Sequence, residues 1–113
     1  MRRPNQLSTS QPYPVERALK TLGSNLRTAR IRRGITRPEA AQKIGTGVRA
    51  VMDAEAGKPA TGIAVYAALL WLYDLLPGFD DLANPLRDEH GLALEGRTRR
   101  ARAQKSPGLD NDF

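Results

Sequence analysis

The chain has 113 residues and a formal net charge of +6, from 18 Lys and Arg against 12 Asp and Glu. That length suits one small domain. Cysteine is absent and histidine occurs once, which excludes disulfides, zinc–thiolate sites, cysteine nucleophiles and multi-histidine metal sites. The excess of cations predicts a polyanionic partner, although a charged surface that only maintains solubility is the alternative.

The charge is unevenly distributed along the chain. Residues 1–14 carry +2 and residues 15–58 carry +6, whereas residues 59–95 carry −5 and residues 96–113 carry +3. Such asymmetry predicts that the two halves of the chain present faces to different partners. The basic first half is the part expected to meet a polyanion.

An irregular arm and a long helix are predicted at the N-terminus. Residues 1–14 are rich in Pro, Ser and Gln and lack an apolar run, so we expect a disordered arm rather than a signal peptide. From residue 15 an apolar side chain recurs every three or four positions, which predicts a helix over 15–33 that ends at Gly34. The apolar stripe comprises Val15, Leu19, Leu22, Leu26 and Ala29.

Two short helices are predicted next, joined by a tight turn. Thr36 and Glu39 have the spacing of a capping box, in which each side chain accepts a hydrogen bond from the other residue's backbone N–H, so a helix is predicted over 37–44. Gly45 can adopt the positive φ that ends this helix, and a further helix is predicted over 48–56. This spacing is typical of a helix-turn-helix, whose second helix enters the major groove of DNA.

A strongly apolar helix is predicted over 62–76, with Thr61 as its cap. It is too short to span a bilayer, which needs about 20 residues. A helix that is apolar on all sides must be covered on several of them, so we expect it to contact a partner surface as well as the core. Beyond it, the sequence predicts a turn of helix at 79–83 and a short helix over 84–90.

Four segments follow from these elements. Residues 1–14 form the arm and residues 15–76 the helical DNA-binding domain. Residues 77–95 are an acidic extension with a short helix, and residues 96–113 are expected to be a flexible basic tail.

Three segments carry a pattern that points to a known family. They read Leu26-Arg27-x-x-Arg30, Thr36-x-x-Glu39-Ala40-Ala41-x-x-Ile44-Gly45 and Val51-x-x-x-Glu55-x-Gly57-Lys58. With this pattern, residues 22–76 resemble the lambda-repressor-like, or XRE, helix-turn-helix family. The resemblance implies an all-α fold of four to five helices that binds double-stranded DNA.

The resemblance also implies roles for individual residues. Arg30 and Glu55 would form a structural ion pair. The free face of helix 48–56 would meet the bases through Val48, Arg49, Met52 and Asp53. Phosphate contacts would come from Arg37, which could alternatively brace a base contact, from Lys43 and Lys58, and from the backbone around Thr61.

Chemistry supports some of these roles and weakens others. Arg49 can donate to both O6 and N7 of guanine, and Val48 can pack on a thymine methyl group. Asp53 is useful there only against a cytosine amino group or to orient Arg49. Gly47 stands where the family usually has a Ser or Thr cap. This face carries a single cation, so direct base contacts are few. We therefore expect phosphate contacts and the spacing of the two copies in a dimer to contribute more to DNA binding.

The C-terminal part carries a second resemblance. The segments Leu69–Leu72, Pro77–Leu94 and Arg97–Arg102 are similar to small HipB-like antitoxin regulators. Those proteins repress their own operon and pair with a HipA-like kinase toxin, which implies a homodimer and a protein partner. The acidic segment 74–95 is a candidate surface for one of these two contacts. The residues of helix 62–76 expected in the core or at the dimer interface are Tyr66, Leu70, Trp71 and Tyr73.

The sequence therefore predicts a cytoplasmic, nucleoid-associated transcriptional repressor, specifically the autoregulatory antitoxin of a HipA-like toxin. A phage or mobile-element repressor is one alternative, and a protein-interaction module that has lost DNA binding is another. We expect no catalysis, cofactor, metal or membrane contact. The acidic residues near His90 are interpreted as solvated surface, namely Asp80, Asp81, Asp88 and Glu89.

Overall fold

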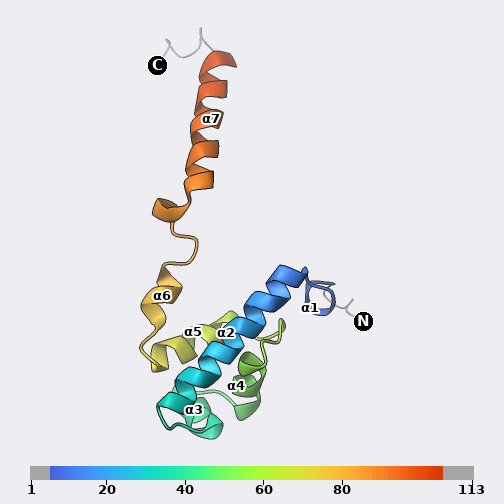
Figure 1. Ribbon diagram of the computed structural model, residues 1–113, viewed down its shortest axis with the longest axis vertical. Helices are drawn as coiled ribbons and strands as arrows, with labels where there is room; N and C mark the ends of the chain where they lie inside the picture. Colours follow the sequence, from blue (N-terminus) through green and yellow to red (C-terminus); the bar gives the residue numbers. More distant parts are fainter. Residues whose placement is uncertain (1–5, 106–113) are drawn as a thin grey trace. The chain divides into compact units, whose positions relative to one another are not determined.

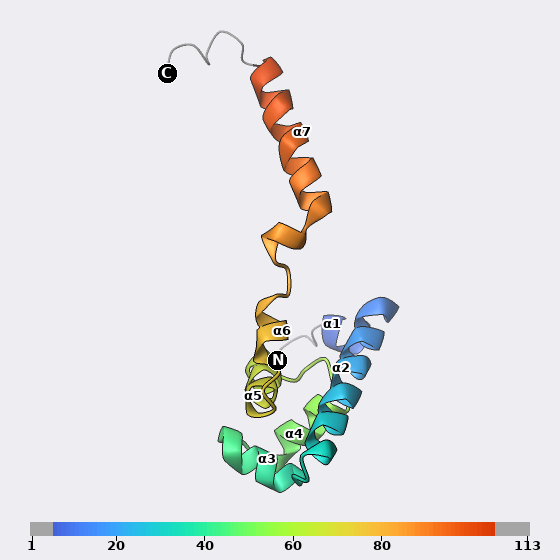
Figure 2. The ribbon, with the colours of Figure 1, turned by 60° about the vertical axis from the view of Figure 1, so that its left-hand side comes forward.

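The computed structural model describes residues 6–105, and all regular structure in this range is helical (Figures 1 and 2), which confirms the expected all-α class there. None of these helices is long and apolar enough to cross a membrane. In chain order they are α1 (Gln6–Thr9), α2 (Tyr13–Arg32), α3 (Arg37–Ile44), α4 (Val48–Glu55), α5 (Ile63–Leu72), α6 (Leu76–Asp80), the 3-10 helix η1 (Pro85–Arg87) and α7 (Glu89–Lys105).

The chain divides into two units, residues 1–79 and residues 80–113. In the first unit, α4 packs against α2, α3 and α5, and α3 also contacts α5. Both views show α3 and α4 side by side next to the C-terminal half of α2 (Figures 1 and 2). The buried apolar core of this unit consists of Leu26, Ala29, Ala40, Ala41, Val51, Ala54, Tyr66, Leu69 and Tyr73.

The boundaries of α3 follow from the local sequence. The Thr36 hydroxyl accepts a hydrogen bond from the backbone N–H of Glu39 at 3.2 Å, and the Glu39 carboxylate accepts one from the backbone N–H of Thr36 at 3.3 Å. Gly45 follows the last turn with a φ of 78°. The predicted capping box, left-handed stop and range 37–44 are all confirmed, because each depends on contacts within a few residues.

Gly23 allows α2 and α4 to approach closely. A Cβ atom at this position would lie 2.6 Å from the backbone oxygens of both Ala54 and Glu55, well inside van der Waals contact. From sequence alone, a glycine inside a helix is expected only to weaken that helix. In the fold Gly23 is the contact point at which the last turn of α4 rests on α2.

Helix α5 ends at Leu72 rather than at the predicted residue 76. Asp74 adopts a φ of 61°, a left-handed conformation that Asp tolerates better than most residues. The backbone N–H of Leu75 then donates to the carbonyl of Leu70 at 2.7 Å, which closes a Schellman-type turn. The apolar pattern concealed this stop, since it continues through Leu75 and Leu76.

The predicted disordered arm is partly wrong. Residues 6–9 form the short helix α1, and α2 begins at Tyr13 with Pro12 as its N-cap. Proline near a helix start costs no hydrogen bond, because the first N–H groups have no partner within the helix. Residues 1–5 of the arm lie outside the described residues.

The second unit consists of η1 and α7, which contact each other. The predicted helix start at Asn84 and Pro85 is confirmed, because Asn84 caps η1 through a hydrogen bond from the backbone N–H of Leu86. The predicted range 84–90 is divided between η1 and the start of α7, and the turn expected at 79–83 is replaced by the end of α6 and a non-helical turn. Asp88 caps α7, because its carboxylate accepts a hydrogen bond from the backbone N–H of Gly91 at 2.9 Å.

The predicted flexible tail is helical as far as residue 105, because α7 runs without a break through its basic half. Arg and Ala are strong helix formers, and they make up six of the ten residues from 96 to 105. The remaining part of the tail, residues 106–113, is not described.

Candidate nucleic-acid interface

The two short helices α3 and α4 are joined by residues 45–47, and α4 has a buried side and an exposed side. Val51, Ala54 and Glu55 are buried, whereas Val48 and Met52 are about two-fifths exposed. Gly47 caps α4 without a side-chain hydrogen bond, as its lack of a hydroxyl predicts. Helix α4 is therefore packed against the rest of the unit on one side and exposed to solvent on the other.

A buried ion cluster holds α4 against α2 and α3. Arg30 Nε donates to Glu55 Oε2 at 2.6 Å, and the Glu55 side chain is only 3% exposed. Arg30 Nη1 also donates to the backbone carbonyl of Ile35 at 2.8 Å. The hydrogen bond to Glu55 raises the pKa of the Arg30 guanidinium. The structure thus joins the two residues that the family resemblance pairs.

Arg37 is a third member of this cluster, which sequence reasoning missed. Its Nε donates to Glu55 Oε1 at 3.0 Å, and its side chain is 39% exposed. One carboxylate therefore meets two guanidinium groups, so the cluster keeps a net positive charge at its exposed end. Arg37 remains available to an anion only through the part of its guanidinium that faces solvent. The contact could not be found from spacing, since the partners lie 18 positions apart.

Asp53 lies between two cations on the exposed side of α4. Its Oδ1 is 3.2 Å from Lys58 Nζ and 3.7 Å from Arg49 Nε. The Arg49 side chain is three-quarters exposed. Exposed ion pairs contribute at most about 1 kcal/mol. Arg49 can therefore leave Asp53 for a stronger acceptor, and Asp53 is placed to orient it.

A shallow hollow lies beside α4, between the end of α2 and the start of α3. Its apolar lining includes Ile31, Pro38, Val48 and Met52, and Arg37 lies at the same surface. This part of the α4 face is apolar with a cationic edge, a combination suited to base methyl groups beside phosphates.

The remaining residues predicted at phosphates differ in availability. Lys43 is exposed, and Lys58 is exposed but paired with Asp53. The backbone N–H of Thr61 donates to the carbonyl of Lys58 at 3.1 Å, so it is not free for a phosphate. Thr61 does not cap α5 either: Gly62 is the N-cap, without a side-chain hydrogen bond. The expectation that Thr61 caps α5 is therefore wrong, and among the backbone N–H groups expected near a phosphate, the one of Thr61 itself is already occupied.

The aromatic residues predicted for the core or the dimer interface separate into two groups. Tyr66 and Tyr73 are buried in this chain's own core and present no surface to a second copy. Trp71 is 60% exposed, and Leu70 is half-buried against the core. The predicted interface is thereby narrowed to Trp71 and Leu70.

Tyr73 is tied to the end of α2. Arg33 Nη2 donates to its backbone carbonyl at 2.8 Å, and the Arg33 guanidinium lies 5.6 Å from the centre of its ring. Burial, with a further contribution from the charge of Glu55, raises the pKa of the Tyr73 hydroxyl.

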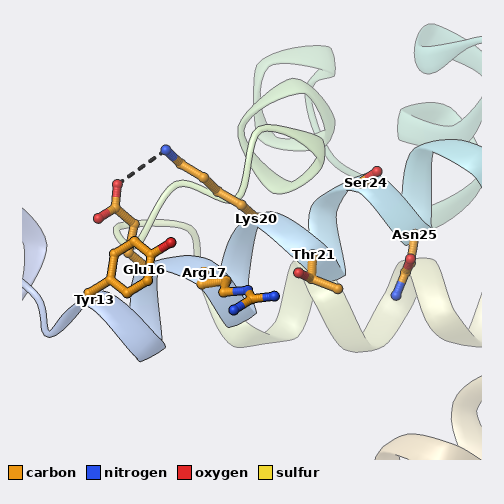
Figure 3. A pocket seen from close by; sticks show the side chains of 7 residues that line it. All are labelled: Tyr13, Glu16, Arg17, Lys20, Thr21, Ser24 and Asn25. Carbon is orange, nitrogen blue, oxygen red and sulfur yellow. Dashed lines mark ion pairs between the residues drawn. The ribbon is translucent and has the colours of Figure 1, made fainter.

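A second hollow lies along the N-terminal half of α2 (Figure 3). The side chains drawn there all project from this one helix, and Lys20 points toward Glu16, with 3.1 Å between Lys20 Nζ and Glu16 Oε1. Ligand sites usually bring together polar groups from several elements. This surface lacks such convergence, so the α4 face is the stronger candidate.

Comparisons of the chain with family models, curated proteins and solved structures found no match.

Proposed function

We propose that the chain is a sequence-specific regulator of transcription that binds double-stranded DNA and acts as a repressor. In this proposal α3, the turn and α4 form a lambda-repressor-like helix-turn-helix, with α4 in the major groove. The observation that carries the proposal is the α4 face itself, which is free on one side and fixed from behind by the cluster around Glu55.

The dimensions of α4 suit this role. An α-helix is about 10–12 Å across with its side chains, and the major groove of B-DNA is about 12 Å wide, so the eight-residue α4 can enter it. Arg49 would read O6 and N7 of guanine, while Val48 and Met52 would contact thymine methyl groups. Asp53 would orient Arg49 or accept from a cytosine amino group.

Phosphate contacts would supply most of the affinity. Residues 15–58 carry +6, and Lys43 projects from the last turn of α3. Lys58 and the exposed end of Arg37 add further cations near α4. Such contacts position the protein without selecting a sequence, so they favour every duplex equally.

The proposed DNA-binding unit is a homodimer. Trp71 and Leu70 on α5 would form the contact, since Trp71 is 60% exposed and tryptophan is enriched in protein–protein interfaces. Two copies would place α4 in successive major grooves, about 34 Å apart.

The biological setting proposed is an antitoxin that represses its own operon. The HipB-like resemblance of the C-terminal segments supports this setting, and the acidic segment of residues 74–95 is a candidate surface for a HipA-like kinase toxin. Copurification of a kinase-like protein with the tagged chain would support this setting. Its absence would favour the phage or mobile-element repressor.

A protein-interaction module without DNA binding is the second candidate. The observation that favours it is Asp53, whose carboxylate lies close to both Arg49 and Lys58 and so reduces the positive potential of the α4 face.

A titration of the protein with the DNA that lies upstream of its own gene distinguishes the DNA-binding regulator from the protein-interaction module. We expect affinity for duplex DNA to fall steeply with salt, and Arg49→Ala to weaken specific binding by about 1–3 kcal/mol, or five- to 150-fold. Arg17→Ala is the matched control, since Arg17 is exposed on α2 and away from α4. Equal, small effects of both changes, or binding without salt dependence, would favour the interaction module.

A further inference from the structure

The second half of α7 is the most densely cationic helical segment among the described residues. Residues 97–102 include four arginines and no acidic residue. All four are exposed. Only Arg99 has an ion pair within the described chain, with Glu95 one turn earlier. At about 1.5 Å per residue, four positive charges occupy roughly 8 Å of helix.

These arginines are spread around the helix rather than along one side. Successive residues of an α-helix differ by about 100°. Relative to the first of them, the four side chains leave the axis at about 0°, 200°, 300° and 140°, for Arg97, Arg99, Arg100 and Arg102 in that order. No sector wider than about 140° lacks a cation, so the helix is cationic on all sides.

This distribution discriminates between possible partners. Binding to a membrane surface, or in an apolar protein groove, needs an apolar stripe opposite the charged face. Here Leu92 and Leu94 precede the arginines, and at two positions apart they point about 160° away from each other. A helix with cations on every side can pair most of them with anions when it lies in a groove that has negative charge on both walls.

Helical stability gives a second, independent indication. Within α7, Gly96 lowers helix propensity, and the like-charged pairs Arg97–Arg100 and Arg99–Arg102 repel each other across one turn. A helix of 17 residues is only marginally stable in water without a packed face. A polyanion would relieve the repulsion and so favour the helical form.

We propose that the arginine-rich half of α7 is a second DNA-binding element, which contacts the phosphates of duplex DNA through one of its grooves. The proposal rests on the proposed function of α4, because α4 brings the chain to DNA. B-form DNA is favoured over duplex RNA, since an α-helix about 10–12 Å across fits the DNA major groove, whereas the RNA major groove is deep and narrow. This element adds affinity and salt dependence, and it leaves the choice of sequence to α4.

The test compares two full-length variants with the wild type. One replaces Arg97, Arg99, Arg100 and Arg102 by Gln, and the matched control replaces the same four by Lys. Affinity is measured by fluorescence anisotropy between 50 and 200 mM salt. The probes are a DNA duplex enriched from a random pool by binding to the protein, the same duplex with its bases scrambled, and a duplex RNA. Thermal unfolding of each variant checks that the fold is kept, as expected for exposed positions.

We expect the Gln variant to lose up to four phosphate contacts. The slope of log affinity against log salt would become shallower by about 3–4 on both DNA duplexes, since each contact contributes about 0.9. The ratio of the wild-type affinity for DNA to that of the Gln variant would fall about 100-fold between 50 and 200 mM salt. The Lys variant would keep the slope.

Other results would overturn the proposal. An unchanged slope for the Gln variant on DNA would show that α7 is not at phosphates, and a loss confined to RNA would identify RNA as its partner. A wild type with no preference between the two DNA duplexes would contradict the function proposed for α4, while the slope difference still decides the role of α7.

Discussion

The close approach at Gly23 gives a prediction whose sign differs from the usual effect of the substitution. Replacing Gly by Ala inside a helix normally stabilises it by about 0.5–1 kcal/mol. Here the new Cβ would lie 2.6 Å from two backbone oxygens of α4, where ordinary contact begins at 3.4 Å. Helix α2 would have to move away from α4 by roughly 0.8 Å, because backbone oxygens cannot rotate aside as a side chain can.

The magnitude follows from these two opposing terms. Overpacking of this kind costs about 1–3 kcal/mol, so Gly23→Ala should destabilise the first unit by about 1–2 kcal/mol after the gain in helix propensity. For a unit of this size that lowers the Tm by roughly 4–16 °C. Urea denaturation and thermal unfolding, both followed by circular dichroism, measure the change.

Gly96→Ala in α7 is the matched control. The nearest atom to a Cβ at Gly96 is Arg100 Nη2 at 4.0 Å, so only helix propensity changes, and helicity should rise. A Gly23→Ala protein as stable as the wild type, or more stable, would refute the close packing of α2 on α4.

Further predictions concern the buried groups and the exposed tryptophan of the first unit. Glu55→Gln leaves Arg30 buried without a counter-charge and should lower the free energy of unfolding, measured by urea denaturation, by about 3–5 kcal/mol. The control Glu16→Gln breaks only an exposed pair with Lys20 and should lower it by less than about 1 kcal/mol. Equal losses of stability would contradict the role of the cluster. The buried Tyr73 hydroxyl has no hydrogen-bond partner within the described chain, so Tyr73→Phe should be neutral or stabilising, while Tyr66→Phe loses the bond to the Lys58 carbonyl and should cost about 0.5–1.5 kcal/mol. Burial raises the pKa of Tyr73 above its ordinary value of 10.0, so the unfolded chain ionises at this residue before the folded chain does. The free energy of unfolding is therefore unaffected by this residue below pH 10.0 and falls as the pH rises from there through the higher folded-state pKa. Absorbance at 295 nm should show a late tyrosine transition that Tyr73→Phe removes, and its persistence in that variant would count against the assignment. If the chain forms the proposed homodimer through α5, Trp71→Asp should yield a monomer by light scattering with little change in Tm, since the side chain is 60% exposed. A variant that still dimerises would place the interface elsewhere.

Local sequence was sufficient for the features that depend on neighbouring residues. The range of α3, its capping box and the stop at Gly45 all involve partners within a few positions, and all three are confirmed. The lack of a side-chain cap on α4 followed equally from Gly47.

Features that depend on distant partners could not be found in the same way. Gly23 meets the backbone of Ala54, 31 positions further along, and Arg37 meets Glu55, 18 positions away, so no spacing rule connects them. In the resemblance Arg37 was a phosphate ligand. The fold gives it a structural contact as well, because its Nε points to the buried carboxylate.

The errors at the ends of the chain have a different cause. The charge and polarity of residues 96–105 are typical of flexible tails, but their Ala and Arg content favours a helix. The early end of α5 could not be predicted from sequence, because the left-handed residue that ends it is Asp74 rather than the usual Gly.

The central claim is that the free face of α4 selects a DNA sequence. The most direct measurement is the ratio of affinities for a duplex enriched from a random pool and for the same duplex with its bases scrambled, at physiological salt. A specific regulator should give a ratio of at least about 1,000, and Val48→Ala/Arg49→Ala should reduce that ratio while leaving the affinity for the scrambled duplex nearly unchanged. A wild-type ratio near one would contradict the claim, however tightly both duplexes bind.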